Sequence, residues 1–262
     1  MQLTCEVLKL GQFPYETAWE LQASLAAEIA EGSRPPTLLL LEHPHTYTFG
    51  RGGHPENLLW DDQELAQRQV SVLWVDRGGD VTYHGPGQLV GYPLLPLAPG
   101  GLKAGPADPR LPQADYVGYL RKLEETLILA LMRLGVASGQ VQGLTGVWVQ
   151  PHVLSRCVSC KPELRKAPAK IAAIGVKVDV KGVSRHGFAL NVNPDMDYWE
   201  GIVGCGLKDY PVTSLADLLD PPPSMQQAIQ AVTTSFGEVF GYRLIESDSA
   251  EILALIKKGK TL

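Results

Sequence analysis

The sequence predicts an α/β fold in which helices pack against a mixed β-sheet. Short apolar runs, such as residues 37–41, are too brief for helices and are typical of buried strands. Longer segments place apolar residues at helical spacing, most clearly over residues 113–134. The two kinds of segment do not alternate regularly, which argues against a doubly wound sheet. With 262 residues, we expect a single domain spanning residues 1–262.

The N-terminal part is predicted to contain one long helix followed by strands. Residues 12–31 repeat apolar side chains at helical spacing, and Pro14 suits a first helical turn. Residues 37–41 form an unbroken apolar run, which favours a strand buried on both faces. Thr46–Phe49 is expected to be its partner strand. A short helix and two further strands are expected over residues 61–69, 70–75 and 89–95.

The C-terminal part is predicted to begin after a loop rich in proline and glycine at residues 96–112, which is either a lid or a plain crossover. The helix expected over residues 113–134 carries leucines on one face and ends before Gly135. Two later helices each begin at a hydroxyl residue. These helices cover residues 213–219 and 224–240, and the expected strands cover 146–150, 171–180 and 188–192.

Composition and charge narrow the class of protein. Charged residues make up 19% and hydrophobic residues 45% of the chain, as in an ordinary globular protein. A net charge of −5 gives no general attraction to nucleic acid, so no nucleic-acid partner is expected. The apolar runs are too short to cross a bilayer, and the N-terminus lacks a signal-peptide pattern. Four cysteines without a secretory signal favour the cytoplasm.

The segment at residues 77–88 has the composition of a ligand-binding loop. It reads RGGDVTYHGPGQ, and its glycines allow backbone angles and close approaches that other residues do not. A glycine- and proline-rich surface loop is the plain alternative. The admixture of Arg77, Tyr83 and His84 favours a site over a simple loop.

Cys205 and Lys170 are candidate catalytic residues. Cys205 lies between two glycines, which would leave its thiol open to an acyl group. Taken alone, a buried structural thiol is the better interpretation of one cysteine. Lys170 precedes an apolar strand, where a desolvated amine gives up its proton more readily and an ammonium would favour a nearby thiolate. Lys177 and Lys181 are alternatives on the same segment.

Cys157 and Cys160 have the two-residue spacing of a metal or redox pair, but the signal is weak. His152 and His186 are conceivable further ligands, although the chain has no second cysteine pair at this spacing. A structural insertion is the first interpretation, a zinc site the second and a redox switch the third. We therefore expect no metal and no cofactor, and no nucleotide-binding glycine loop of the Walker type is present.

Four blocks of sequence together resemble the octanoyltransferase family, also called lipoate-protein ligase B or lipoyl(octanoyl) transferase. The blocks read RGGDVTYHGPGQLVGYP from Arg77, KIAAIGV from Lys170, HGFALN from His186, and CGL from Cys205 with TSL at residues 213–215. They occur in the family's order, and the resemblance is strongest over residues 37–219.

The resemblance implies a biotin/lipoate protein ligase-like fold and a catalytic domain that needs no cofactor. It implies transfer of an octanoyl or lipoyl group from acyl carrier protein to a lysine of a lipoyl domain, in 2-oxoacid dehydrogenases and the glycine cleavage H protein. Cys205 would form the acyl thioester, Lys170 would move protons, and backbone N–H groups or His84 would hold the oxyanion. The acyl-binding residues carried over are Arg77, Gly78, Gly79, Asp80, Val81, Thr82, Tyr83, His84, Ala173, Ile174, Gly175, Gly187, Phe188 and Ala189.

Two other functions stay open at this point. An ATP-dependent lipoate-protein ligase would share the fold and a related glycine block, but it would activate a free acid and need no cysteine. A non-catalytic module that binds an acyl group or a carrier protein would use Cys157 and Cys160 to hold a structural metal.

Overall fold

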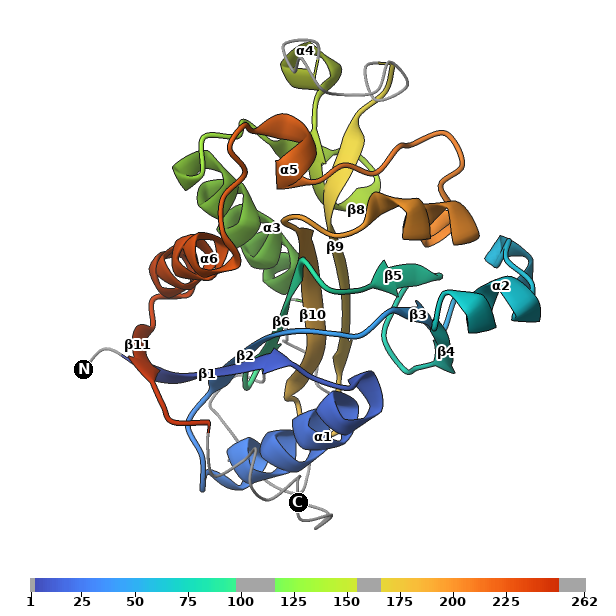
Figure 1. Ribbon diagram of the computed structural model, residues 1–262. Helices are drawn as coiled ribbons and strands as arrows, with labels where there is room; N and C mark the ends of the chain where they lie inside the picture. The colour runs from blue at the N-terminus through green and yellow to red at the C-terminus, as the bar shows by residue number, and fades with distance from the viewer. Residues whose placement is uncertain (1–2, 98–115, 155–165, 250–262) are drawn as a thin grey trace.

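The computed structural model describes residues 3–97, 116–154 and 166–249, and a large mixed sheet forms its centre (Figure 1). Its strands are β1 (Thr4–Gln12), β2 (Thr37–Glu42), β6 (Gln88–Leu94), β7 (Gly139–Val141), β8 (Leu144–Val149), β9 (Ala169–Val178), β10 (Ser184–Asn191) and β11 (Arg243–Glu246). They lie in the order β11-β1-β2-β6-β10-β9-β8-β7. β1 runs parallel to β11 and β2, whereas the other neighbouring pairs are antiparallel. The mixed α/β fold expected from the sequence is confirmed.

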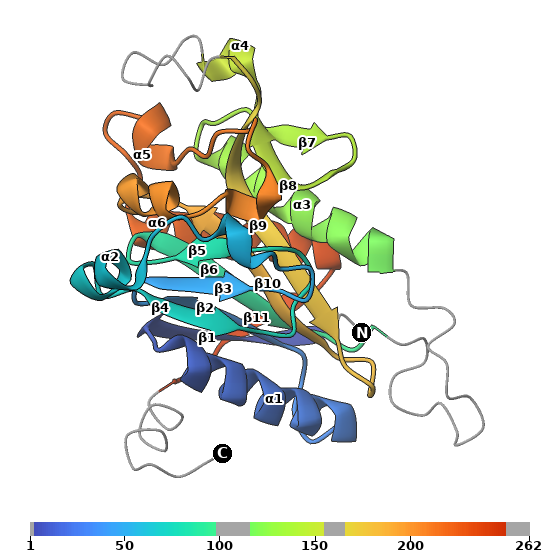
Figure 2. The same cartoon turned by 90° about the vertical axis from the view of Figure 1, so that its right-hand side faces the viewer.

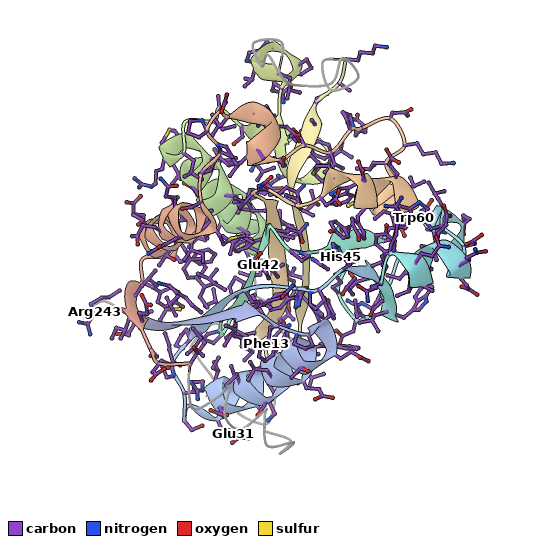
Figure 3. All side chains as sticks on the ribbon, viewed as in Figure 1. Phe13, Glu31, Glu42, His45, Trp60 and Arg243 are labelled. Atoms are coloured by element: carbon purple, nitrogen blue, oxygen red, sulfur yellow. The ribbon has the colours of Figure 1, made fainter. Side chains whose placement is uncertain are left out.

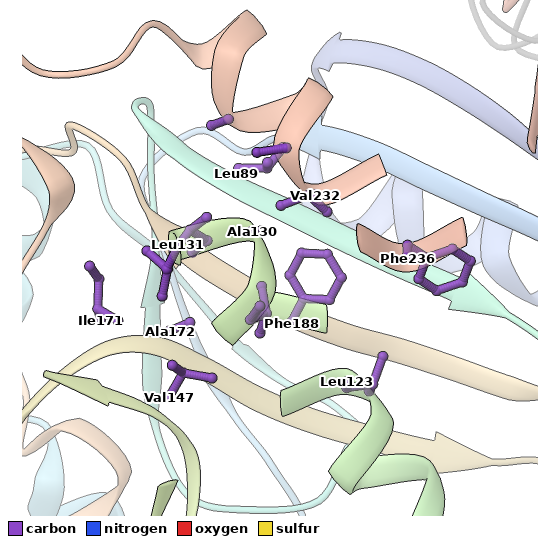
Figure 4. Packing of buried hydrophobic residues seen from close by; sticks show 14 of the residues in the cluster. Leu89, Leu123, Ala130, Leu131, Val147, Ile171, Ala172, Phe188, Val232 and Phe236 are labelled. Atoms are coloured by element: carbon purple, nitrogen blue, oxygen red, sulfur yellow. The ribbon is translucent and has the colours of Figure 1, made fainter. Parts of the chain in front are cut away.

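Helices cover both faces of this sheet. α1 (Tyr15–Glu31) lies on one face, and α3 (Tyr116–Arg133) and α6 (Met225–Phe240) lie together on the other (Figures 1 and 2). In β2, Leu38 and Leu40 pack in the core next to α3 and α6, while Leu39 and Leu41 pack against α1. The apolar run is therefore a strand buried on both faces, as predicted. Figure 4 shows the core on the α3 side, where Phe188 of β10 packs among side chains of both helices.

A second, smaller sheet lies beside the first. It contains β3 (Thr46–Phe49), β4 (Ser71–Trp74) and β5 (Thr82–His84) in the order β4-β3-β5. The prediction that Thr46–Phe49 pairs with the preceding strand is wrong, because β2 is already paired with β1 on one edge and β6 on the other. α2 (Asp62–Gln67) packs on this sheet through Leu65. In Figure 3, His45 and Trp60 mark this side of the molecule.

The first expected helix is shorter at its start than the sequence suggests. α1 begins at Tyr15, and residues 4–12 form β1, which the sequence analysis did not predict. The strand has no strict alternation, because Val7 and Leu8 are both buried and its register with β2 shifts between Lys9 and Gly11. Other elements that were not predicted are β5, β7, β11 and the short α4 (Pro151–Leu154).

The last predicted helices are present and begin with side-chain caps. Ser214 and Ser224 each form a capping box, at the starts of α5 (Leu215–Leu218) and α6. Short 3₁₀ turns complete the described chain: η1 (Pro55–Asn57), η3 (Met196–Gly201) and η4 (Gly204–Gly206). Most of the loop expected at residues 96–112 lies outside the described residues. Among the helices of the described ranges, none combines the length and hydropathy needed to cross a membrane.

Candidate active site

A cavity of about 410 Å³ brings the four sequence blocks together. It lies between the small sheet, strands β9 and β10 of the large sheet, and the turn that carries Cys205. Of the residues expected at the site, those that line it are Arg77, Gly78, Gly79, Asp80, Thr82, His84, Lys170, Ala173, Ile174, Gly175, Gly187, Phe188, Ala189 and Cys205. Residues far apart in the sequence therefore share one cavity.

Two expected residues do not line this cavity. Val81 and Tyr83 are fully buried, and their side chains belong to the core of the small sheet. Successive side chains of a strand point to opposite faces, so Thr82 and His84 face the cavity when Tyr83 does not. The lining residues that the sequence analysis did not name for the site are Tyr15, Tyr92, Leu120, Gly143, Leu144, Thr145, Val176, His186 and Leu207.

Cys205 occupies a strained position in the turn η4. Its φ of 56° and ψ of 19° lie in the left-handed region, which is uncommon for a residue other than glycine. The following residue, Gly206, also has a positive φ of 68°. Such strain persists only where the surrounding structure imposes it, and it concentrates at functional sites. The thiol is partly exposed and lines the cavity.

Asp80 and Asn57 impose this geometry. The Cys205 N–H donates to the carbonyl of Val81 at 2.8 Å, and the Val203 N–H donates to the carbonyl of Asn57 at 2.8 Å. The Asn57 amide donates to Asp80 Oδ2 at 2.5 Å, while Asp80 Oδ1 accepts from the Val81 N–H at 2.7 Å. The two side chains thus tie together both segments that hold the Cys205 turn.

Lys170 is held beside the same cavity with little contact with water. It lies on β9 and is only 6% exposed. Its backbone N–H donates to Pro211 at 2.8 Å, and its carbonyl accepts from Thr213 at 2.9 Å. Its Nζ lies 4.7 Å from the centroid of the Trp148 ring. The other predicted lysine candidates differ: Lys177 forms an ion pair with Asp76, and Lys181 is an exposed residue.

Arg77 places a buried positive charge in the cavity wall. Its guanidinium donates to the hydroxyl and carbonyl of Thr48 and to the carbonyl of Gly78. Within the described ranges, no carboxylate forms an ion pair with it. Burial lowers the pKa of Arg77 from its ordinary value. The acceptors to which its guanidinium donates are all neutral, so its positive charge can also attract a negative charge that develops in the cavity.

A chain of side-chain hydrogen bonds sets the tautomer of His84. The Asn191 amide nitrogen donates to the Thr213 carbonyl at 3.0 Å, so Asn191 Oδ1 accepts from Gln88 Nε2 at 2.9 Å. Gln88 Oε1 must then accept from His84 Nδ1, which lies 2.9 Å away. The Thr213 carbonyl can only accept a hydrogen bond. The donor in each bond of the series from Thr213 to His84 is therefore determined.

The hydrogen-bond chain places a proton on Nδ1 of His84, so in the neutral ring the other nitrogen, Nε2, is an acceptor. Burial holds its pKa well below the ordinary value, which favours the neutral form. In this tautomer Nε2 has no proton to give to an oxyanion. The expectation that His84 could hold the oxyanion is therefore not supported, and the expectation that backbone N–H groups hold it stays a prediction.

A charged cluster lies where β10 meets α1. Asp76 accepts from His186 Nε2 at 2.7 Å and from Arg185 at 2.8 Å, and it forms an ion pair with Lys177. The hydrogen bond from His186, together with these cations, lowers the pKa of Asp76 below its usual range. Burial lowers the pKa of His186. The Tyr15 hydroxyl, 3.4 Å from His186 Nδ1, links this cluster to the cavity.

No metal site is evident in the part of the chain that the structure describes. Residues 3–97, 116–154 and 166–249 contain no group of three or more histidine, cysteine, aspartate or glutamate side chains arranged to hold an ion. Cys157 and Cys160, the weak metal candidates, lie outside the described residues.

Comparisons of the sequence identify relatives over nearly the whole chain. Residues 14–237 match the family described as the lipoyl protein ligase A/B catalytic domain. An octanoyltransferase of Chloroflexus aurantiacus is 43% identical over 237 residues, which cover 90% of this chain and 94% of that protein. An octanoyltransferase of Chloroflexus aggregans is 41% identical over 244 residues, covering 93% and 98%.

Solved structures share the fold at low sequence identity. A bipartite lipoate protein ligase from Thermoplasma acidophilum, solved in a study that included its E2 lipoyl domain, has a TM-score of 0.65 and 17% identity, covering 98% of this chain and 93% of that one. A lipoate-protein ligase A bound with ATP has a TM-score of 0.60 and 17% identity, covering 98% and 95%. The expected lipoate-ligase fold is therefore confirmed.

Proposed function

The chain belongs to the family of lipoyl protein ligase A/B catalytic domains, and we propose that its Cys205 carries an octanoyl group from acyl carrier protein to a lysine of a lipoyl domain. The relatives make the protein an acyltransferase that moves octanoyl or lipoyl groups. The donor, the cysteine intermediate and the assignment of residues 1–262 to one catalytic domain are our proposals. The observation that best supports them is that the strained Cys205 and the buried Lys170 line one cavity.

In the first half-reaction, the sulfur of Cys205 attacks the carbonyl carbon of the carrier thioester. Lys170 Nζ accepts the thiol proton, the bond between the carbonyl carbon and the carrier sulfur breaks, and Lys170 returns the proton to the departing thiol. Arg77 provides positive charge in the cavity wall while the oxyanion exists. The product is an octanoyl thioester on Cys205 and a free carrier thiol.

In the second half-reaction, the amine of the acceptor lysine attacks the thioester on Cys205. A carbon–nitrogen bond forms, Lys170 accepts a proton from the amine, and the carbon–sulfur bond to Cys205 breaks. The proton then passes to the Cys205 sulfur and restores the starting enzyme. Exchange between thioesters is close to isoenergetic and amide formation is downhill, so neither step requires ATP.

The acyl chain is proposed to lie along β9 and β10. Ala173, Gly175 and Ala189 line the cavity with little or no side chain, which leaves room beside the two strands. Each methylene buried there contributes about 0.8 kcal/mol. The binding free energy of an octanoyl chain would thus be more favourable than that of a shorter acyl group by several such increments.

The acceptors that we propose are the lipoyl domains of 2-oxoacid dehydrogenases and the glycine cleavage H protein. Their modification follows from the lipoyl-transfer function of the family, whereas the choice among them stays a prediction. The cytoplasmic location also stays a prediction, and it depends on the cysteine usage of the sequence.

The test of this function is transfer without ATP. Purified protein is mixed with octanoyl carrier protein and an apo lipoyl domain, and the mass of the lipoyl domain is followed. We expect one octanoyl group per domain, and no transfer by Cys205→Ser. Cys5→Ala is the matched control, because burial raises the pKa of the Cys5 thiol to about 12 and keeps it unreactive.

If the protein were an ATP-dependent ligase, the same assay would give the opposite result. Such an enzyme would modify the domain only when free octanoate and ATP are supplied, and Cys205→Ser would retain activity. That result would overturn our proposal.

A further inference from the structure

We infer that Trp148 is a positioning residue that holds the terminal nitrogen of Lys170 against the face of its indole. This inference rests on the proposed function, in which Lys170 carries protons for Cys205. Trp148 lies on β8 and is fully buried. The face of its indole lies 4.7 Å from Lys170 Nζ, well within the range of a cation–π interaction.

The indole is the principal partner of this amine. Lys170 is 6% exposed, and in the described ranges its Nζ forms no ion pair and donates no hydrogen bond. An ammonium without water or an anion nearby is costly to bury. The negative face of an aromatic ring offsets part of that cost, and it does so more strongly where water is excluded.

Strand pairing places the two side chains together. Trp148 pairs directly with Lys170 across β8 and β9, and residues directly opposite on neighbouring strands share a face. The register shifts next to this pair, because Val147 pairs with Ala172 and Ile171 is left over. Such a bulge redirects side chains and is common beside active sites.

Tyr210 also packs against the indole of Trp148. The two rings meet edge to face with centroids 5.4 Å apart. Tyr210 precedes Pro211, whose carbonyl accepts the backbone N–H of Lys170. One segment therefore supports both the ring and the lysine backbone.

The chemical consequence concerns proton transfer rather than acyl binding. When the Cys205 thiol gives its proton to Lys170 Nζ, the amine becomes an ammonium, and the indole face attracts the ammonium more than the amine. Replacing Trp148 should therefore disfavour thiolate formation while leaving the residues along the acyl chain unchanged.

The experiment is a double-mutant cycle between Trp148 and Lys170. Trp148→Phe keeps an aromatic face, Trp148→Leu removes it, and each is made with Lys170 or with Lys170→Ala. The readout is the rate at which iodoacetamide alkylates Cys205, followed by mass spectrometry of the peptide that contains it. Single-turnover acylation by octanoyl carrier protein is measured alongside.

With Lys170 present, we expect Trp148→Leu to slow both reactions about tenfold and Trp148→Phe to slow them less. The KM for octanoyl carrier protein should stay unchanged. With Lys170→Ala, neither substitution at Trp148 should change the alkylation rate further, because the two residues act as a unit. Phe236→Leu is the control for general loss of packing, since Phe236 is equally buried but belongs to the core beside α6.

The inference would be overturned if Trp148→Leu slowed alkylation equally with and without Lys170. It would also be overturned if Phe236→Leu slowed alkylation as much as Trp148→Leu does. If Trp148→Leu does not fold, the cycle with Trp148→Phe gives the same decision. Failure of the proposed function can be told apart from failure of this inference. If the unsubstituted protein formed no acyl-enzyme, the proposed function would be wrong. The alkylation rates would still measure the coupling between Trp148 and Lys170.

Discussion

The amide nitrogen of Cys205 lies 2.8 Å from the carbonyl oxygen of Val81 and donates a hydrogen bond to it. This bond joins the candidate nucleophile to the glycine-rich segment, which lies nearly half of the chain earlier in the sequence. Because Cys205 has a left-handed backbone, its geometry depends on the residues that hold Val81 in place. The rate of acyl transfer should therefore respond to substitutions that touch neither the thiol nor the acyl chain.

Asn57→Asp tests the support of the Cys205 turn. The Asn57 amide donates to Asp80 at 2.5 Å, and a carboxylate in its place would repel Asp80 instead. We expect acylation to slow on the order of 10²-fold through misplacement of the nucleophile, and stability to fall by about 1–3 kcal/mol. Single-turnover acylation and urea denaturation measure the two effects.

Glu56→Gln is the control for that substitution, because its side chain is exposed in the same 3₁₀ turn. Glu56→Gln should change neither the acylation rate nor the stability to urea noticeably. Full activity and full stability in Asn57→Asp would show that the Asn57–Asp80 contact does not govern Cys205.

Gly206→Ala tests the turn from the other side of the nucleophile. Its φ is 68°, and an added Cβ would lie 2.9 Å from Asp80 Oδ2. The left-handed backbone alone costs an alanine roughly 1–2 kcal/mol. Gly241→Ala is the matched control, since Gly241 has a φ of 73° and open space around its Cβ position.

Both alanine variants should lose similar stability because each places an alanine in a left-handed backbone. Only Gly206→Ala should also lose acylation activity. Thermal melting together with single-turnover acylation makes the comparison. Equal activity in the two variants would mean that contact with Asp80 does not position Cys205.

Gly175→Ala tests the proposed path of the acyl chain. The new Cβ would lie 3.0 Å from the Gly78 carbonyl and 3.2 Å from Arg77 Cδ, which narrows the cavity there. We expect kcat/KM for an octanoyl donor to fall more than that for a butanoyl donor, because the loss of a buried methylene or two amounts to several-fold in rate. Gly139→Ala is the control, as its Cβ position is open and lies away from the cavity. An equal fall for both donors would argue against this path.

Several strands of the sheet could be predicted because their signals are local, whereas the meeting of the four blocks was expected only from the family resemblance. Leu38 to Leu41 alternate between two cores, so an unbroken apolar run was the correct sign of a strand buried on both faces. Cys205 stood out because it lies between two glycines, and the structure gives it a left-handed backbone.

Other contributions to the site depend on packing over long distances. Tyr15 reaches the cavity because α1 packs on β6 and β10, and nothing near Tyr15 in the sequence indicates that. β1 escaped prediction because its buried residues do not alternate strictly and its partners lie in distant segments. The contact of Trp148 with Lys170 likewise depends on the register of β8 with β9.

Stability should fall on mild acidification because of buried neutral histidines. Burial lowers the pKa of His43 from 6.5 to about 4, so the unfolded chain binds a proton before the folded protein does. Stability is thus complete above pH 6.5 and decreases as the pH falls toward 4, by about 3 kcal/mol for His43. Burial of His84 and His186 lowers the pKa of each and acts in the same direction.

Urea denaturation at pH 7 and pH 4.5 checks this dependence, and His43→Gln should reduce the difference between the two values. His54→Gln is the control, because the His54 side chain is exposed. If the difference in stability between pH 7 and pH 4.5 were unchanged in His43→Gln, His43 would not be a cause of the pH dependence.

Intact-mass analysis shows whether Cys205 carries the acyl group. The protein is exposed to octanoyl carrier protein without an acceptor, and its mass is measured before and after hydroxylamine treatment. We predict one octanoyl adduct that hydroxylamine removes and that Cys205→Ser does not form. An active protein whose Cys205 stays unmodified throughout turnover would exclude Cys205 as the carrier of the acyl group.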